Sequence, residues 1–125
     1  MNRRALHIII GVTLVLLSVS CGQQHQAKEV IQEFVDQYAA DPSSRSSISI
    51  TKFDSTFVLS DSVIYRMRTN ADTIKRYQKA IRYTDGDISR KLFIARISYT
   101  IDTTEFSDTY YLDDHLTRVV AFKTN

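Results

Sequence analysis

The chain has 125 residues, 43% of them hydrophobic, which is enough for one packed domain and excludes an intrinsically disordered chain. Arg3 and Arg4 lie in the leader, and without them 14 basic residues stand against 14 acidic ones, which removes any case for nucleic-acid binding from bulk charge. One cysteine excludes an internal disulfide, and three histidines are too few to predict a dedicated metal site or cofactor.

The N-terminal segment combines Arg3 and Arg4 with a nearly unbroken apolar run over residues 5–17. A basic start and a short apolar core are typical of a secretory signal, whereas a spanning helix needs about 20 apolar residues. Three small residues, 18–20, then lead to Cys21. We therefore expect a signal peptide over 1–20. An uncleaved anchor helix and conventional cleavage after a small residue are the alternatives.

The stretch "LSVSCGQ" resembles the lipobox of bacterial lipoproteins, in which the cysteine is lipidated and becomes the new N-terminus. Leu17 stands one position before the usual leucine, as in the relaxed lipoboxes of Bacteroidota. The resemblance implies lipidation of Cys21, and Gly22 in place of Asp implies the outer membrane. The next residues lack the acidic cluster linked to surface export, so we expect a periplasm-facing protein, with the cell surface as the alternative.

Residues 21–26 then form the lipid anchor and a short polar tether, after which an amphipathic helix is predicted over 27–38. Its apolar residues recur at helical spacing: Val30, Ile31, Phe34, Val35 and Tyr38. Asp41-Pro42 ends it, because Pro restricts the residue before it and cannot continue a helix.

A strand is predicted over 47–59, which is rich in Ile, Thr, Phe and Val. Ile48 and Ile50 share one phase of this strand, whereas Phe53 and Phe57 share the other. One extra residue reverses the facing of a strand, so we expect a bulge or bend near Lys52.

A second helix is predicted over 61–82, with N-cap candidates at Ser60, Asp61 and Ser62. Its apolar residues step by three and four: Val63, Ile64, Met67, Ala71, Ile74, Tyr77 and Ile81. The turn "TDGD" at 84–87 ends it.

Three strands are predicted over 91–101, 106–112 and 117–123, joined by turns at 102–105 and 113–115. The first alternates apolar and more polar residues, as a half-buried strand does. In the second, Phe106, Tyr110 and Leu112 share one phase.

The predicted order is α-β-α-β-β-β over a single domain, 27–125. We expect an α+β fold in which two helices pack on one face of a four-stranded, mainly antiparallel, curved sheet. This order resembles the cystatin-like and NTF2-like group and the small lipoproteins of Bacteroidota. The resemblance rests on element order alone, so it carries no functional residue over.

Few residues suggest chemistry. His115 beside Asp113 and Asp114 would form an acid–base pair, but neighbours in a turn usually point to water. Asp85 and Asp87 around Gly86 lack the further ligands of a calcium loop. The chain has no phosphate-binding loop, zinc-protease motif or nucleophile elbow, and an enzyme is not expected.

Two surface hypotheses remain. If the second helix is continuous, four basic residues fall on one face as an anion- or headgroup-facing surface: Arg68, Lys75, Lys79 and Arg82. The alternative is a solvated face paired with acidic residues of the first helix. Tyr99 and Tyr110 would line a pocket between sheet and helix, or else pack in the core.

We therefore expect a non-enzymatic, lipid-anchored envelope protein that recognises another envelope protein. A small-ligand-binding domain that uses the concave sheet face is the alternative. An NTF2-like enzyme is the last alternative, because such relatives use an inward acid–base pair that the sequence does not identify. The expected partners are the membrane, through the N-terminal lipid, and no nucleic acid.

Overall fold

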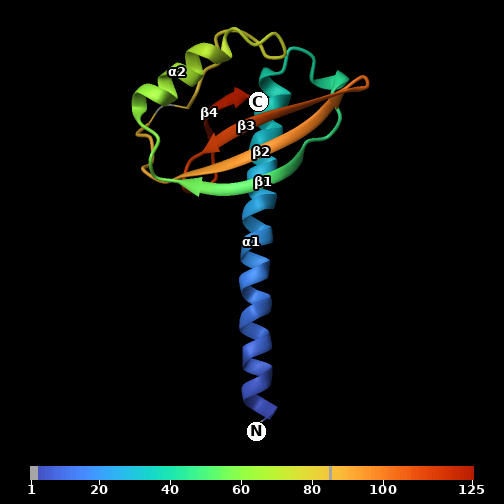
Figure 1. Ribbon diagram of the computed structural model, residues 1–125, viewed down its shortest axis with the longest axis vertical. Coiled ribbons are helices and arrows are strands. Elements are labelled where there is room, and N and C mark those ends of the chain that lie inside the picture. Colours follow the sequence, from blue (N-terminus) through green and yellow to red (C-terminus); the bar gives the residue numbers. More distant parts are fainter. Residues whose placement is uncertain (1–2, 85) are drawn as a thin grey trace.

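The computed structural model describes residues 3–84 and 86–125, with side chains from Cys21 onward. The elements follow the predicted order, with a short 3-10 helix, η1, after the first helix. Their bounds are α1 Arg3–Tyr38, η1 Pro42–Ser44, β1 Ser49–Thr56, α2 Asp61–Ala71, β2 Leu92–Ile101, β3 Thr104–Leu112 and β4 Val119–Thr124. Figure 1 shows α1 as a long rod that crosses the sheet.

The four strands form one antiparallel sheet in the order β1-β2-β3-β4, which confirms the α+β class and the C-terminal meander. A tight turn at Asp102 and Thr103 joins β2 to β3, with Asp102 in the left-handed region at φ 56°. Asp tolerates that conformation better than most residues.

The bulge predicted near Lys52 is confirmed. The pairing of β1 with β2 shifts register between Ile50 and Lys52. Ile48, before the shift, and Phe53, after it, both reach the same hydrophobic cluster although they differ in phase. One extra residue therefore lets both halves of the segment face the core.

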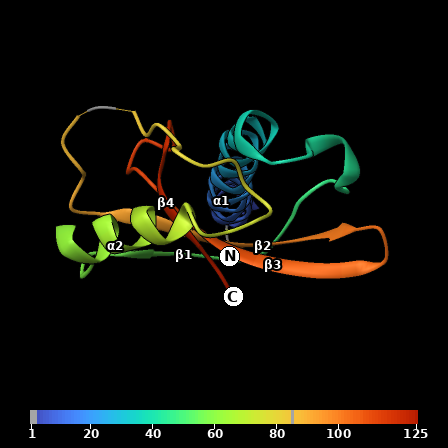
Figure 2. The same ribbon diagram turned by 90° about the horizontal axis from the view of Figure 1, so that it is seen from above.

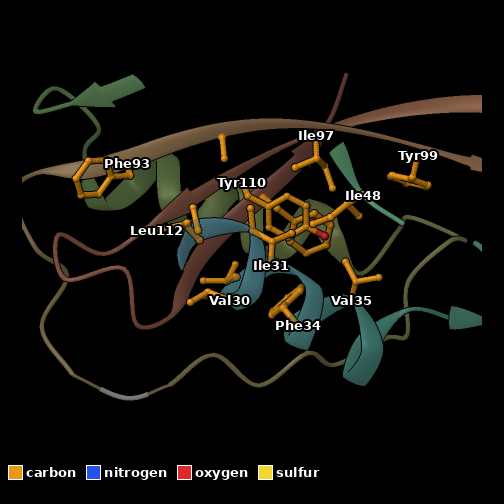
Figure 3. Close-up of a cluster of buried hydrophobic side chains, with 14 of the residues drawn as sticks. Val30, Ile31, Phe34, Val35, Ile48, Phe93, Ile97, Tyr99, Tyr110 and Leu112 are labelled. Atoms are coloured by element: carbon orange, nitrogen blue, oxygen red, sulfur yellow. The ribbon is translucent and has the colours of Figure 1, made fainter. Parts of the chain in front are cut away.

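The main core lies between α1 and the inner face of the sheet, which is the face that carries Phe93, Ile97 and Tyr110 (Figure 3). Ile31 of α1 is fully buried there, and Phe34 meets the ring of Tyr110 edge-on at a centroid distance of 5.8 Å. Burial of large apolar side chains, each contributing about 1.5–3 kcal/mol, holds α1 on this face.

The second helix runs along β4, and two of its three buried side chains pack on the opposite, outer face, whereas Ala71 at its end joins the main core. A smaller cluster joins Ile64 and Met67 of α2 to Leu92, Tyr111 and Ala121 of the sheet. Each of these sheet residues precedes or follows a residue of the inner face, and neighbours along a strand point to opposite sides. The expectation that both helices cover one face is therefore wrong.

The second helix is also shorter than predicted. Ser60 is its N-cap, as expected, but the helix ends at Ala71 rather than near residue 82. The Asp72 carboxylate accepts a hydrogen bond from Ala80 N at 3.0 Å, and Ala80 lies in the left-handed region. The Thr73 hydroxyl donates to Asn70 O. Short polar side chains that bond to nearby backbone compete with the helix and end it here.

Beyond α2 the chain crosses irregularly to the inner face, where it passes beside the end of α1 (Figure 2). Gln78 N donates to Tyr38 O at 2.7 Å, and Ala40 N donates to Arg76 O at 3.0 Å. Three of the apolar residues that were predicted at helical spacing join the main core from this segment: Ile74, Tyr77 and Ile81. Tyr83, which follows them, packs against the same core.

Helix α1 continues without a break through residues 21–26, the segment predicted to be a polar tether. The side chains of these six residues are exposed, and Ala27 is the first buried one. The core therefore begins where the sequence places the start of the domain, but the segment before it is helical.

Candidate functional site

Cys21 lies on the exposed part of α1 and carries a free thiol. Its side chain is therefore open to modification, which is the requirement that lipidation places on it. Over the residues whose side chains are described, no helix has both the length and the apolar character needed to cross a membrane.

The predicted basic surface does not form, because α2 is not continuous through its residues. Arg68 lies on α2, where its Nε donates to Val120 O at 2.8 Å and its guanidinium lies 4.5 Å from the Tyr83 ring centroid. Lys75, Lys79 and Arg82 are exposed on the irregular segment. Arg68 therefore fastens this segment to β4 and is not one of four residues on a helix face.

The alternative interpretation of these basic residues was a solvated face paired with acidic residues of the first helix. The structure agrees with only part of it. Lys75, Lys79 and Arg82 are indeed solvated. Among the described side chains, however, no ion pair joins these residues to the acidic side chains of α1.

The rings of Tyr99 and Tyr110 are packed in the main core and do not line an open pocket between sheet and helix. Tyr99 is 2% exposed and Tyr110 is fully buried. The ring of Tyr110 stacks on Phe122 at a centroid distance of 5.1 Å. The packing interpretation holds for the rings, but the two hydroxyls take part in a polar cluster.

We call this group the Asp108 cluster: Asp108, Arg76, Tyr77, Tyr99 and Tyr110. Oδ2 of the fully buried Asp108 accepts from the hydroxyls of Tyr99 at 2.6 Å and Tyr77 at 2.7 Å. Oδ1 pairs with Arg76 Nη2 at 3.0 Å, and Arg76 Nε donates to the Tyr99 hydroxyl at 3.0 Å. The hydroxyls of Tyr77 and Tyr110 lie 2.6 Å apart.

Two further side chains, Arg45 and Phe106, pack against the cluster. The Arg45 guanidinium lies between the rings of Tyr77 and Tyr99, 4.7 and 4.6 Å from their centroids, and its Nη2 donates a hydrogen bond to Arg76 O. Arg76 lies over the Phe106 ring at 4.3 Å. Each such contact stabilises a cation by about 0.5–2 kcal/mol. Arg45 thus links the loop after α1 to the segment after α2.

Burial raises the pKa of Tyr77, Tyr99 and Tyr110, and the nearby Asp108 carboxylate adds to the shift. The three hydroxyls therefore stay protonated, and those of Tyr77 and Tyr99 donate to the carboxylate. Both carboxylate oxygens accept hydrogen bonds from protein donors, so the arrangement satisfies a buried charge.

Asp108 was not predicted as a site residue, although the sequence carries a signal for it. Asp108 shares its phase in β3 with Phe106, Tyr110 and Leu112, which were expected to face inward. A charged residue at an inward strand position needs partners, and tyrosine hydroxyls together with an arginine provide them.

Asp113 caps the turn between β3 and β4. Its carboxylate accepts from Thr117 N at 2.7 Å, Thr117 Oγ1 at 2.6 Å and Arg118 N at 2.9 Å. Burial would raise the pKa of Asp113, but these hydrogen bonds outweigh it and lower the pKa. His115 is exposed, 3.8 Å from Asp114, as expected of a solvated turn.

The turn predicted at "TDGD" is tied to the same region. Arg118 donates to the carbonyls of Thr84 and Asp87, at 2.6 Å each, and Gly86 adopts φ 134°, which suits glycine. Asp85 lies outside the described residues. In the described part of the chain, no group of three or more acidic, histidine or cysteine side chains is placed to hold a metal ion.

Large apolar side chains are exposed at one corner of the fold, where β1 leads into α2. Phe57 is 60% exposed, Val58 87% and Tyr65 63%. We call these three residues the apolar corner. Phe57 and Val58 follow directly after β1, which is an edge strand and pairs on one side only, whereas Tyr65 lies on α2. An unpaired strand edge beside exposed apolar side chains can accept a segment of another protein.

Comparison with protein-family models, with curated proteins and with solved structures finds no match to this chain, so the candidate surfaces are judged by their geometry alone.

Proposed function

We propose that this protein is a lipid-anchored component of the outer membrane that faces the periplasm and binds another envelope protein. Binding uses the apolar corner and the free edge of β1. The protein acts by recognition rather than catalysis and needs no cofactor.

The leader and Cys21 support the anchor. A basic start, a short apolar run and small residues precede a cysteine whose side chain is exposed. Acyl chains on this residue contribute about 0.8 kcal/mol per buried methylene, so more than one chain holds a protein firmly in a bilayer.

The exposure of Phe57 and Val58 is the observation that carries the binding proposal. Both follow directly after an edge strand, and Val58 is 87% exposed. Apolar side chains grouped at a strand edge mark interaction sites more often than single exposed ones do.

The Asp108 cluster gives no support to catalysis, because both oxygens of its buried carboxylate accept hydrogen bonds from protein donors. The packing of α1 on one face of a meander sheet also supports a place in the cystatin-like and NTF2-like group, where a curved sheet wraps a helix. Such scaffolds serve unrelated functions, so the site carries the argument and the fold does not.

The lipid anchor is tested by expressing the Cys21→Ser variant in the cells that naturally make the protein. We expect the wild-type protein to enter the detergent phase and incorporate labelled palmitate. The variant should incorporate no palmitate and should keep its leader. Because the apolar leader can itself enter the detergent phase, palmitate incorporation is the deciding measurement. Ser62→Ala, on the exposed side of α2, is the control and should behave as wild type. Palmitate incorporation by the Cys21→Ser chain would contradict the anchor.

The binding surface is tested by placing a photo-crosslinking amino acid at Val58 in cells. We expect an adduct of one constant mass, which is absent when the crosslinker replaces the exposed Lys79 and is lost when Phe57→Asp is added. Adducts of equal yield at both positions would contradict a specific surface. An adduct at twice the chain mass would show self-association in place of a different partner.

A further inference from the structure

The outer face of the sheet carries a row of basic side chains that neither helix covers. The strand register places Lys52 opposite Arg96, Arg96 opposite Thr109, and Thr109 opposite Lys123. These four residues form one line across all four strands, which we call the cross-strand row. Neighbouring strands lie about 4.8 Å apart, so the cations are within mutual reach of their long side chains.

The row lies on the outer face because its residues alternate with buried inner-face residues. Arg96 stands between Ala95 and Ile97, and Lys123 follows Phe122, all of which are fully buried in the main core. Lys52, Arg96 and Lys123 are themselves exposed. The cations therefore point away from α1, into the part of the outer face that α2 leaves open.

The arrangement costs stability unless an anion is present. Lys52 and Arg96 are directly paired like charges, which destabilise a sheet at that position. Among the described side chains, none of the three cations forms an ion pair. The nearby Asp54 lies one row away, and its Oδ1 accepts from Ser55 N.

The row borders a shallow hollow of about 170 Å³. Thr109 forms its floor, is 5% exposed, and donates its hydroxyl to Asn125 Oδ1 at 2.8 Å. The short threonine leaves room between the long side chains of Arg96 and Lys123. The hollow is smaller than the pockets of about 300–1,000 Å³ that hold drug-sized molecules, so it suits a single anionic group.

We propose that the cross-strand row binds a phosphate group, with Lys52, Arg96 and Lys123 as its charged donors and Thr109 as the floor of the site. The guanidinium of Arg96 supplies a planar pair of donors that matches two phosphate oxygens, and each lysine supplies a point charge. The phosphate comes either from a free phosphate compound or from a phospholipid headgroup.

A phosphate fits better than an acidic peptide, because the three cations border one hollow instead of following an extended path. Asp54 lines the same hollow and disfavours either anion, so it does not decide between them. This site lies on the outer face and does not depend on the apolar corner, so the two proposals can fail separately.

The test uses the full chain in a non-ionic detergent at low ionic strength. Inorganic phosphate and glycerophosphoglycerol, the deacylated headgroup of phosphatidylglycerol, are titrated separately by calorimetry, with a hexaglutamate peptide as a third titrant. Sodium chloride at matched ionic strength measures screening alone. The variants are Lys52→Gln and Arg96→Gln, with Lys75→Gln/Lys79→Gln as a control that removes two exposed lysines elsewhere.

We expect saturable phosphate binding that weakens by about 10-fold or more in Lys52→Gln and in Arg96→Gln, because each removes a charge-assisted contact. The control should bind as wild type does. Tighter binding of inorganic phosphate identifies a free phosphate source, and tighter binding of glycerophosphoglycerol identifies a headgroup.

Lys52→Gln also gives a second readout. Without phosphate, the Tm of this variant should be higher than that of the wild type, because a like-charge pair is removed. Phosphate should raise the Tm of the wild type but not that of the variant. Equal binding by all variants, an effect matched by sodium chloride, or binding of hexaglutamate without binding of phosphate would each overturn the proposal.

Discussion

The two faces of the sheet differ in how their polar side chains are paired, although the same four strands form both. On the inner face Asp108 is fully buried and meets Arg76, Tyr77 and Tyr99. On the outer face the adjacent Thr109 lies in a row of cations that form no ion pair among the described residues. The completed network on the inner face indicates a structural role, and the unpaired cations on the outer face are the basis of the proposed phosphate site.

Asp108→Asn should give the largest effect and tests whether the inner network is structural. Arg76 then keeps its charge without an anion, and loss of one partner of a buried pair costs about 3–5 kcal/mol. We expect the lower end, because 23% of the Arg76 side chain is exposed. Urea denaturation measures the change in the free energy of unfolding.

The matched change on the outer face is Lys123→Gln, which should alter the free energy of unfolding by no more than about 0.5 kcal/mol. A similar loss in both variants would break the distinction between the two faces.

Tyr99→Phe should cost about 2 kcal/mol, because it removes a hydrogen bond to a charged carboxylate and leaves Arg76 Nε without an acceptor. Tyr65→Phe is the control, since Tyr65 is 63% exposed. The two free energies of unfolding are compared by thermal and urea denaturation. If Tyr99→Phe lowers the free energy of unfolding by less than Tyr65→Phe does, the Tyr99 hydroxyl is dispensable to the cluster.

Asp113→Asn should cost about 1 kcal/mol near neutral pH, a typical value for a capping side chain. The pKa of Asp113 is lower in the folded state than its ordinary value of 3.8. Its contribution is therefore complete above that value and is lost as the pH falls through the lower folded pKa. Denaturation from pH 7 to pH 2 should show the two proteins converging in stability, whereas Asp114→Asn should follow wild type throughout.

Lys52→Thr should give the smallest change, and of opposite sign. Removing a like charge beside Arg96 and adding a residue that favours strands should stabilise the sheet by a few tenths of a kcal/mol. The gain should shrink as salt is added, because screening already weakens the repulsion in wild type. A loss of stability would show that the row is not under electrostatic strain.

Local signals predicted much of the sheet. The inward phase of β2 and the bulge near Lys52 follow from the alternation of apolar residues. The length of α2 does not, because the apolar residues Ile74, Tyr77 and Ile81 are buried from an irregular segment at spacings that resemble a helix. Burial sets such spacings, and hydrogen bonding of the backbone decides between helix and loop.

The candidate sites were harder to predict, because they depend on strand register. Lys52 and Lys123 are 71 positions apart in the chain, and only the pairing of β1 with β2, β2 with β3 and β3 with β4 places them in one line. Arg76 likewise reaches Asp108 from a segment that the sequence assigned to a helix. Charge patterns along the chain carry no information on such pairings.

The helix is unbroken between Cys21 and the buried Ala27, so under the proposed lipidation residues 21–26 would be a spacer of fixed length rather than a flexible linker. Six residues of α-helix span about 9 Å. With a lipid on Cys21, that spacer would set the distance of the domain from the bilayer and its orientation. In Figure 1, β1 is the strand nearest the N-terminal half of α1, so it would be the strand closest to the membrane. One residue added within the spacer would turn the whole domain by about 100°.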